Sequence, residues 1–455
     1  MHQSEPQSEL IPPVAPEPHP LDAVESRPSA VATAEADEPS CEAPVEKVSK
    51  RAVVAILITT FGNTAAVMLP SLVALPLIME RIAPDNKETA LGVATGIIAF
   101  GTMILAPVCG ALSDRTTSRF GMRRPGLAVG GMMAVAGLTW LGLSGSLPAA
   151  FGALTLLALG QGLVNASHAA MTPDSIPEHA RGRVVGLSSL FGLLAALLAG
   201  IVGPQFIGNQ LLMAAGGVPL YILTFVIGIA IYRDRRLSPA EVPQQPLIRT
   251  VARAYVFNPK SAPDYSWVWL SRFLITFGVA FTGSFAIYYL TDHLGVTKKE
   301  LPSLISVNNM LSMVGALVGT IVGSFVTDRV RSRKPLILIS ALMLAAGSAV
   351  VAFAPSIPFF FVGSALIAVA TGFFIPTDGV LVMSVLPDGG RDVARYMSLF
   401  VIADQLPRSI GPVMAPAILA LGGMTALGGY PALYLAGGVV AIVGGVVVRR
   451  ARGVA

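Results

Sequence analysis

The sequence has few charged residues and almost no cysteine. Only 13% of the 455 residues are charged, whereas 53% are hydrophobic, and a soluble domain carries about 25% charged residues. So little charge cannot cover a water-exposed surface, which excludes an ordinary soluble enzyme and most nucleic-acid-binding proteins. Cys41 lies in a polar stretch and Cys109 in an apolar one, so the sequence predicts no disulfide framework.

Motifs for catalysis and metal binding are missing as well. The sequence contains no GxxxxGK[ST], no HExxH and no CxxC, and its five histidines are scattered along the chain. We therefore expect no enzymatic activity, no cofactor and no metal site.

Residues 1–50 differ from the rest of the chain. They hold ten acidic residues against three basic ones, nine prolines and no aromatic residue. Such a segment cannot bury enough apolar area to offset the entropy lost on ordering it. It also lacks the basic and then apolar order of a signal peptide. We expect a disordered, acidic, proline-rich tail.

Twelve apolar stretches follow this tail. A transmembrane helix needs about 20 mainly apolar residues to cross a bilayer, and the stretches form two sets of six around the polar segment 233–265. They are 53–79, 90–112, 126–146, 149–171, 184–206 and 211–232, then 267–290, 302–326, 335–353, 357–382, 395–421 and 429–448.

Lysine and arginine indicate the orientation, because cytoplasmic loops hold most of them. With the N-terminus inside, 25 of the 31 lie in cytoplasmic loops, four in outer loops and two within spans. We therefore expect a multi-pass protein of the plasma (inner) membrane with both termini in the cytoplasm. The expected regions are a cytoplasmic tail (1–50), a first half (51–232), a central cytoplasmic loop (233–265), a second half (266–449) and a cytoplasmic C-terminus (450–455).

The two halves share short motifs at a fixed offset of 214 residues. The matched pairs are Asp114-Arg115 with Asp328-Arg329, Pro173-Asp174 with Pro387-Asp388, and Arg181 with Arg395. One offset at three places predicts an all-α integral membrane fold, in which twelve transmembrane helices form two pseudo-repeated six-helix halves around a central cavity. One large class of secondary transporters is built in this way.

The loop after the second span carries a family resemblance. Residues 110–115, GALSDR, resemble the signature loop of the major facilitator superfamily. The longer string 107–125, PVCGALSDRTTSRFGMRRP, is similar to the loop of glycoside–pentoside–hexuronide and sucrose-type cation symporters. The resemblance to the superfamily covers about residues 52–450, and it implies a secondary active transporter.

The resemblance also implies a gate on the cytoplasmic side. In the superfamily the residue equivalent to Asp114 packs against the start of span 11, here 391–395, and Asp328 would do the same against span 5, near Arg181 and Arg183. These contacts would hold the cytoplasmic side closed, although basic loops could also serve orientation alone. The expected gating residues are Asp114, Arg115, Arg124, Asp174, Arg181, Asp328, Arg329, Asp388 and Arg395.

Two carboxylates are expected at mid-membrane depth, where a charge costs roughly 2.5–3.5 kcal/mol by insertion scales. Asp404 lies nine residues after Arg395, about 13–14 Å along a helix, and can pair with Arg408 at i, i+4. This pair is either structural or part of a substrate or proton site. Asp378 has no partner on its own helix and is expected to couple protons, unless it pairs with Arg408 or Arg272.

Hydrogen-bonding side chains complete the expected site. In this superfamily spans 1, 4, 7 and 10 line the cavity, which favours Asn63, Asn165, His168, Tyr288 and Tyr289 together with Arg408 as substrate-binding residues. His168 could instead be a packing residue, and the tyrosines could be interfacial anchors. In sucrose-type relatives an arginine follows the amide of span 4, but Ala169 stands at that position here.

The sequence thus predicts a proton-coupled transporter that works by alternating access. We expect its solute to be small and polar, a sugar or a glycoside. Its partners would be the solute, protons and the lipid bilayer, with no nucleic acid, and we expect it to function as a monomer. One alternative is a proton-driven efflux antiporter for drugs or secondary metabolites, since Gly203-Pro204 loosely resembles an antiporter motif. Another is a non-transporting membrane sensor or scaffold with the same fold.

Overall fold

The computed structural model describes residues 48–238, 262–330, 332–386 and 393–451. Secondary structure within these ranges is helical throughout, with no strand. The expected tail, apart from its last three residues, lies outside the described residues, as do most of the central loop and the last four residues.

The first half contains the six expected spans. Two of them are interrupted: a π-helical turn at Pro70–Ala74 separates the first two helices, and Gly216 and Gly217 break the sixth span. The elements are α1 (Lys50–Leu69), α2 (Leu75–Ile82), α3 (Lys87–Ser113), α4 (Arg124–Leu143), α5 (Leu147–Ser175), α6 (Glu178–Val202) with a 3₁₀ turn at Gly203–Phe206, α7 (Gln210–Ala215) and α8 (Val218–Ile231).

The second half repeats this order. The seventh span is interrupted near its end, where α10 is followed by a short helix and a second π-helical turn. The elements are α10 (Pro263–Gly283), α11 (Ala286–Tyr288) with η5 (Tyr289–His293), α12 (Leu301–Arg329), α13 (Lys334–Ala352), α14 (Ile357–Ser384), α15 (Val393–Gly423) and α16 (Gly429–Val447).

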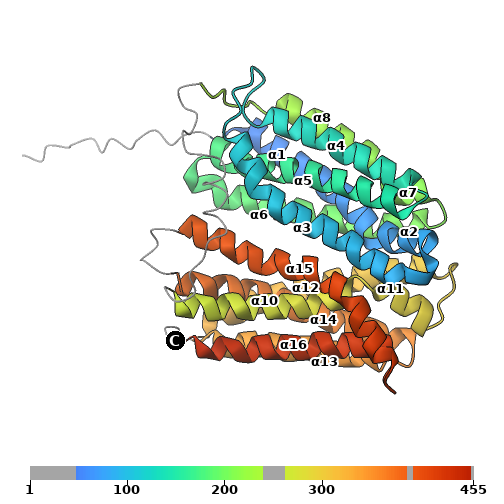
Figure 1. Cartoon of the computed structure of the whole chain (residues 1–455). Coiled ribbons are helices and arrows are strands. Elements are labelled where there is room, and N and C mark those ends of the chain that lie inside the picture. Colours follow the sequence, from blue (N-terminus) through green and yellow to red (C-terminus); the bar gives the residue numbers. More distant parts are fainter. Residues whose placement is uncertain (1–47, 239–261, 331, 387–392, 452–455) are drawn as a thin grey trace, which may run out of the picture. The chain divides into compact units, whose positions relative to one another are not determined.

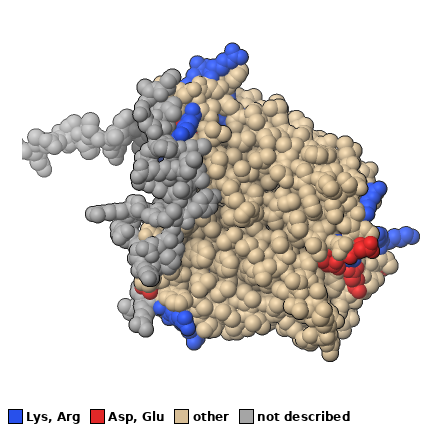
Figure 2. Space-filling model, viewed as in Figure 1, with Lys and Arg blue, Asp and Glu red and all other residues tan. Residues whose placement is uncertain are grey.

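Eleven of the described helical segments are long and apolar enough to cross a membrane. The remaining long helix, α15, has 31 residues but contains three internal prolines and the charged Asp404 and Arg408. Its place in the second half corresponds to that of the fifth span, so the twelve expected spans are all helices. Large apolar side chains lie on the outside of the bundle, and Figure 2 shows a wide uncharged surface between charged ends.

Small residues bring neighbouring helices within each half into backbone contact. A Cβ on Gly160 of α5 would lie 2.6 Å from the carbonyl oxygen of Gly130 in α4, so only glycine fits. In the second half Gly315 of α12 meets Ala365 of α14 in the same way, at 2.9 Å. Close packing of this kind is how helices associate in a bilayer, where water no longer drives them together.

The two halves meet at one end of the bundle. We call the end where α1 begins and α16 ends the terminal face, and the other end the opposite face (Figure 1). Near the opposite face Gly92 and Gly96 of α3 touch Pro412 and Val413 of α15, and Asn309 of α12 donates to the carbonyl of Gly200 in α6 at 3.3 Å. These contacts close the bundle there and leave room between the halves toward the terminal face.

Candidate functional site

A cavity of about 520 Å³ lies between the halves on the terminal side. The first half supplies α3 and α5 to its wall, and the second half supplies α15. Its polar lining residues are Thr102, Asn165 and Gln405; its apolar ones are Met103, Ala106, Pro107, Gly110, Ala166, Ala169, Val401 and Ile402. The expected central cavity therefore has walls from both halves.

A second cavity, of about 510 Å³, is formed by α1, α5 and α6 of the first half. Ala169 lines both cavities, so they lie side by side along α5. Thr60, His168 and Arg181 line the second one. His168 Nε2 lies 3.0 Å from the Thr60 hydroxyl and 3.3 Å from the carbonyl oxygen of Ile56, which ties α5 to α1.

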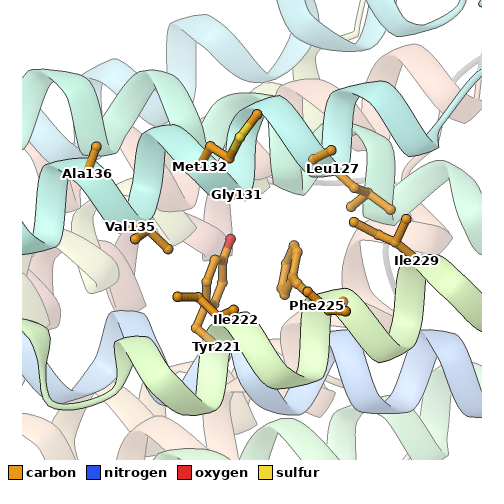
Figure 3. Close-up of a pocket in the computed structure, with 11 residues that line it drawn as sticks. Leu127, Gly131, Met132, Val135, Ala136, Tyr221, Ile222, Phe225 and Ile229 are labelled. Carbon is orange, nitrogen blue, oxygen red and sulfur yellow. The ribbon is translucent and has the colours of Figure 1, made fainter.

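A third hollow is a groove of about 400 Å³ between α4 and α8 (Figure 3). Its lining is apolar apart from the hydroxyl of Tyr221, and Met132 and Val226 on its rim are exposed on the outer surface of the bundle. Such a groove suits hydrocarbon rather than a polar solute. We therefore place the candidate site in the cavity between the halves and the adjoining cavity of the first half.

Four charged side chains form a chain within the second half. The guanidinium of Arg272 in α10 pairs with Asp378 of α14 and lies 3.5 Å from Asp404 of α15. Asp404 accepts from Arg408 at 3.1 and 3.3 Å. Arg272 also lies over the ring of Phe400, 4.0 Å from its centroid. Three helices are thus joined by two carboxylates and two guanidinium groups with no net charge.

These contacts show how the expected charged residues are paired. The expected i, i+4 pair of Asp404 with Arg408 is confirmed. Asp378 is not an isolated carboxylate, because Arg272 is its partner; this is the interhelical pairing that the sequence left open. Sequence reasoning assigned Arg272 no function, since it sits only ten residues inside α10, and no signal within its own helix reveals the partner.

The first half contributes amides. Asn63 of α1 donates to Asn165 of α5 at 3.4 Å, so these two expected residues lie together. The Oδ1 of Asn63 is buried and accepts no hydrogen bond from a described residue, and the Nε2 of Gln161 in α5 likewise has no acceptor. Buried amide groups without partners are costly, and a polar ligand could satisfy them.

Tyr288 and Tyr289 do not face either cavity. Both side chains are fully buried, and their hydroxyls donate to the carbonyls of Pro76 and Val351 at 2.7 and 2.5 Å. The expectation that they line the cavity is wrong for this conformation, because Tyr288 is held against α2 and Tyr289 against the end of α13, near the opposite face.

The terminal face of the first half carries an ionic cluster. Arg123, at the start of α4, lies 2.7 Å from both Asp114 and Asp174 and 2.9 Å from the hydroxyl of Ser113. Burial lowers the pKa of its guanidinium, but hydrogen bonds and charges from Asp174 and Asp114 outweigh burial and raise the pKa above its ordinary value. The cluster joins the ends of α3 and α5 to the start of α4.

Asp234 caps the N-terminus of α4. Its carboxylate accepts the backbone N–H groups of Arg123 and Arg124 at 2.6 and 2.7 Å, as suits a carboxylate at a helix N-terminus. Burial raises its pKa above the ordinary value, although these donors and the two guanidinium groups oppose the shift. The side chain of Arg124 donates to the carbonyl of Tyr232.

The contacts of the expected gating residues lie within the first half as far as they are described. Asp114 pairs with Arg123, which the sequence analysis did not select; the side chains of 391–395, its expected partners, lie outside the described residues. Arg181 donates to the carbonyls of Ile176 and Pro173 in its own half, at 3.1 and 3.2 Å, because these C-terminal carbonyls of α5 need donors.

The remaining gating candidates lie at the terminal ends of their helices. Arg329 stacks on Phe325 at 3.8 Å, and no hydrogen bond of Asp328 to a described residue is found. Arg115 lies in the turn after α3. Asp388 falls outside the described residues, as does the side chain of Arg395.

Polar contacts join the halves at the opposite face. Lys87 at the start of α3 lies 2.6 Å from Asp292, which also accepts from Tyr430 at 2.8 Å. Tyr430 lies 3.3 Å from Glu88, and Lys298 lies 3.5 Å from Glu80. All of these contacts except Asp292–Tyr430 join one half to the other, so separating the halves here would break three of them. We call Lys87, Glu88, Asp292 and Tyr430 the latch.

Comparisons with known proteins agree with this architecture. The family model of the Major Facilitator Superfamily matches residues 52–285 and again residues 268–454, one match for each half. A search of curated proteins finds no significant match.

Solved transporters share the fold at low sequence identity. The nucleoside transporter NupG is 12% identical with a TM-score of 0.66, over 88% of this chain and 98% of that one. A D-xylose–proton symporter is 17% identical with a TM-score of 0.62, over 88% and 96%. A POT family transporter, in complex with a thioalcohol-conjugated peptide, is 13% identical with a TM-score of 0.64, over 88% and 95%. Likeness at this identity shows the fold alone.

Proposed function

The chain belongs to the Major Facilitator Superfamily, and we propose that it moves a small polar solute across the plasma membrane by alternating access coupled to protons. The solute class that we propose is a sugar or a related hydroxylated compound. The observation that carries the proposal is the cavity between the halves, with amides on one side and a charged chain within the helices on the other.

Hydrogen bonding supports a polar solute. Asn165 and Gln405 line the cavity from opposite halves, and Asn63 and His168 lie beside Asn165 or one turn along the same helix. Amides both donate and accept, which suits the hydroxyl groups of a polyol. We propose that Asn63, Asn165, His168 and Gln405 contact the solute.

The charged chain supports proton coupling. With both carboxylates ionised the chain is neutral, and a proton on Asp378 or Asp404 leaves an uncompensated guanidinium. That change alters the attraction between α10, α14 and α15, and a group that favours one conformation in one protonation state shifts the equilibrium between conformations. We propose Asp378 and Asp404 as the proton-coupling residues.

The arrangement of contacts supports alternating access. The latch holds the opposite face together, whereas the cavity lies toward the terminal face. We propose that the terminal face is cytoplasmic, as the distribution of lysine and arginine predicts, so that this conformation is inward-facing. The outward-facing state then requires the latch to break and the terminal ends of the halves to meet.

Reconstitution tests this function directly. Purified protein in vesicles is given sugars, glycosides and cationic drugs while the external pH is recorded. Alkalinisation outside right-side-out vesicles on adding a sugar is the expected result. A response to drugs alone, with protons moving opposite to the drug, would replace the proposal with the efflux alternative. No flux of any solute would favour the sensor alternative.

A further inference from the structure

The four charged residues within the second half differ in their exposure. The side chain of Asp378 is 2% exposed and that of Arg272 is 17%, whereas Asp404 is 22% and Arg408 is 47% exposed. Side-chain exposure therefore increases from Asp378 of α14, through Arg272 and Asp404, to Arg408 of α15. The guanidinium of Arg408 hydrogen bonds with Asp404 and with no other described residue. Arg408 also lies three residues after the cavity-lining Gln405, on the same side of α15, and we take it as the member that a solute can reach.

We propose that the solute carries a carboxylate that binds Arg408, and that it enters together with one proton on Asp404, so that transport is electroneutral. The inference rests on the proposed function, for which it names the solute class: a hydroxylated monocarboxylate. Its parts are the exposed guanidinium of Arg408, its single carboxylate partner and the amides of the cavity.

Charge balance within the membrane is the first argument. Two carboxylates and two guanidinium groups cancel, so the resting chain does not attract an ion. When Asp404 accepts a proton from water, its negative charge is lost and Arg408 loses its partner. An unpaired charge within a membrane span is unfavourable, and a solute carboxylate restores the balance with a bidentate, charge-assisted hydrogen bond.

Among the described residues, the charged groups around Asp404 are Arg272, Asp378 and Arg408. Arg272 faces Asp404 from α10, with Asp378 of α14 on the far side of that guanidinium, and Arg408 faces it from α15. The other helices packed on α15 are α3 and α16. Charged residues in α3 are confined to Lys87 and Glu88 at the opposite face, and α16 has none within Gly429–Val447.

Asp404 is more accessible to a proton than Asp378. Asp378 lies beneath Arg272 and is almost fully buried, so a proton reaching it would have to displace the guanidinium. Asp404 is held by two guanidinium groups at 3.1 and 3.5 Å and is partly exposed. Protonation of Asp404 frees Arg408 directly, while Arg272 keeps Asp378 as its partner.

Amide side chains near the Asp404–Arg408 pair indicate that the solute has polar groups besides its carboxylate. Gln405 follows Asp404 in sequence and lines the cavity, and Asn165 lines it from the other half. The buried Oδ1 of Asn63, beside Asn165, has no donor in the described residues. These groups suit solute hydroxyls, so a carboxylate on a hydroxylated chain satisfies both ends of the site.

Electrical recording separates this inference from the proposed function. A proton carried with a neutral sugar moves one positive charge, whereas a proton carried with a monocarboxylate moves none. Full-length protein in vesicles is given gluconate, glucuronate, lactate, glucose or a neutral glycoside, with pH change and membrane current recorded together. We expect a pH change with a hydroxylated monocarboxylate, no accompanying current and no effect of an imposed potential.

Variants test the two residues separately. Arg408→Gln is expected to weaken carboxylate binding at least tenfold, whereas Arg408→Lys retains part of it. Arg449→Gln, which removes an exposed arginine just after helix α16, is the matched control. Asp404→Asn is expected to keep solute exchange but to lose its pH dependence, because Arg408 is then permanently free.

Each outcome decides one of the two claims. A current with neutral sugars alone overturns the carboxylate inference and leaves the proposed function standing. Carboxylate transport that Arg408→Gln leaves unchanged overturns the role of Arg408. No proton-linked flux with any solute in the wild-type protein overturns the proposed function itself.

Discussion

The two halves have the same helices but put their charges at different depths. In the first half, Arg123 and its partners Asp114 and Asp174 lie at the terminal face, and the cavity wall carries uncharged amides. In the second half, Arg272, Asp378 and Asp404 lie within the spans. The repeat therefore fixes the architecture, while solute contacts and proton coupling are divided between the halves.

The largest effect is expected where this buried charge is left unpaired. Arg272→Ala leaves Asp378 without its partner at 2% exposure, and breaking a buried pair costs about 3–5 kcal/mol. We expect a clear fall in the thermal unfolding midpoint in detergent. The double variant Arg272→Ala with Asp378→Asn should recover much of it; a double variant as unstable as the single one would show that the pair is not the cause.

Removing a carboxylate should affect coupling more than folding. Asp378→Asn and Asp404→Asn are each expected to reduce proton-driven accumulation at least tenfold while solute exchange continues, because one protonation state is then fixed. Asp85→Asn, in an exposed turn at the opposite face, is the control. If both variants kept full proton-dependent uptake, the coupling residues would have to be sought elsewhere.

The terminal cluster of the first half should have a smaller, structural effect. Arg123→Gln removes charged hydrogen bonds to Asp114 and Asp174, which are worth about 2 kcal/mol together with their desolvation. We expect lower thermal stability and unchanged solute selectivity. Arg119→Gln changes an exposed arginine of the same loop and should change neither thermal stability nor solute selectivity. An equal loss of thermal stability in both variants would show that the cluster does not stabilise the protein.

The smallest effect is expected at the latch. Lys87→Met removes one partly exposed ion pair with Asp292, worth about 1 kcal/mol, which is roughly a fivefold change in a conformational equilibrium. We expect greater thiol accessibility of a cysteine introduced at the opposite face, with little loss of stability. Accessibility equal to that of the parent would mean that the latch does not hold the face closed.

Sequence patterns predicted the helices better than the pairings. Apolar length gave all twelve spans, and the offset of 214 residues gave the two halves, because both depend on local composition. The Asp404–Arg408 pair was predictable because it lies within one helix turn. The Arg272–Asp378 pair was not, since 106 residues separate its members and only tertiary packing brings them together.

The same distinction explains the errors. Tyr288 and Tyr289 were placed at the cavity by helix number, but both are buried and donate to backbone carbonyls of distant helices. Arg123 was overlooked among the four basic residues of its loop, although it starts a helix whose neighbours end in Asp114 and Asp174. The triplets Arg123-Arg124-Pro125 and Arg333-Lys334-Pro335 both begin a helix, and this similarity was the available signal.

The most direct test of alternating access measures both faces in one sample. Spin labels at Thr117 and Ser332 report the terminal face, and labels at Asp85 and Thr425 report the opposite face, in a background where Cys41 and Cys109 are serine. We predict that lowering the pH in the presence of a transported solute shortens one distance and lengthens the other, and that Asp404→Asn abolishes the response to pH. Two distances that change together, or that ignore both pH and solute, would contradict the account.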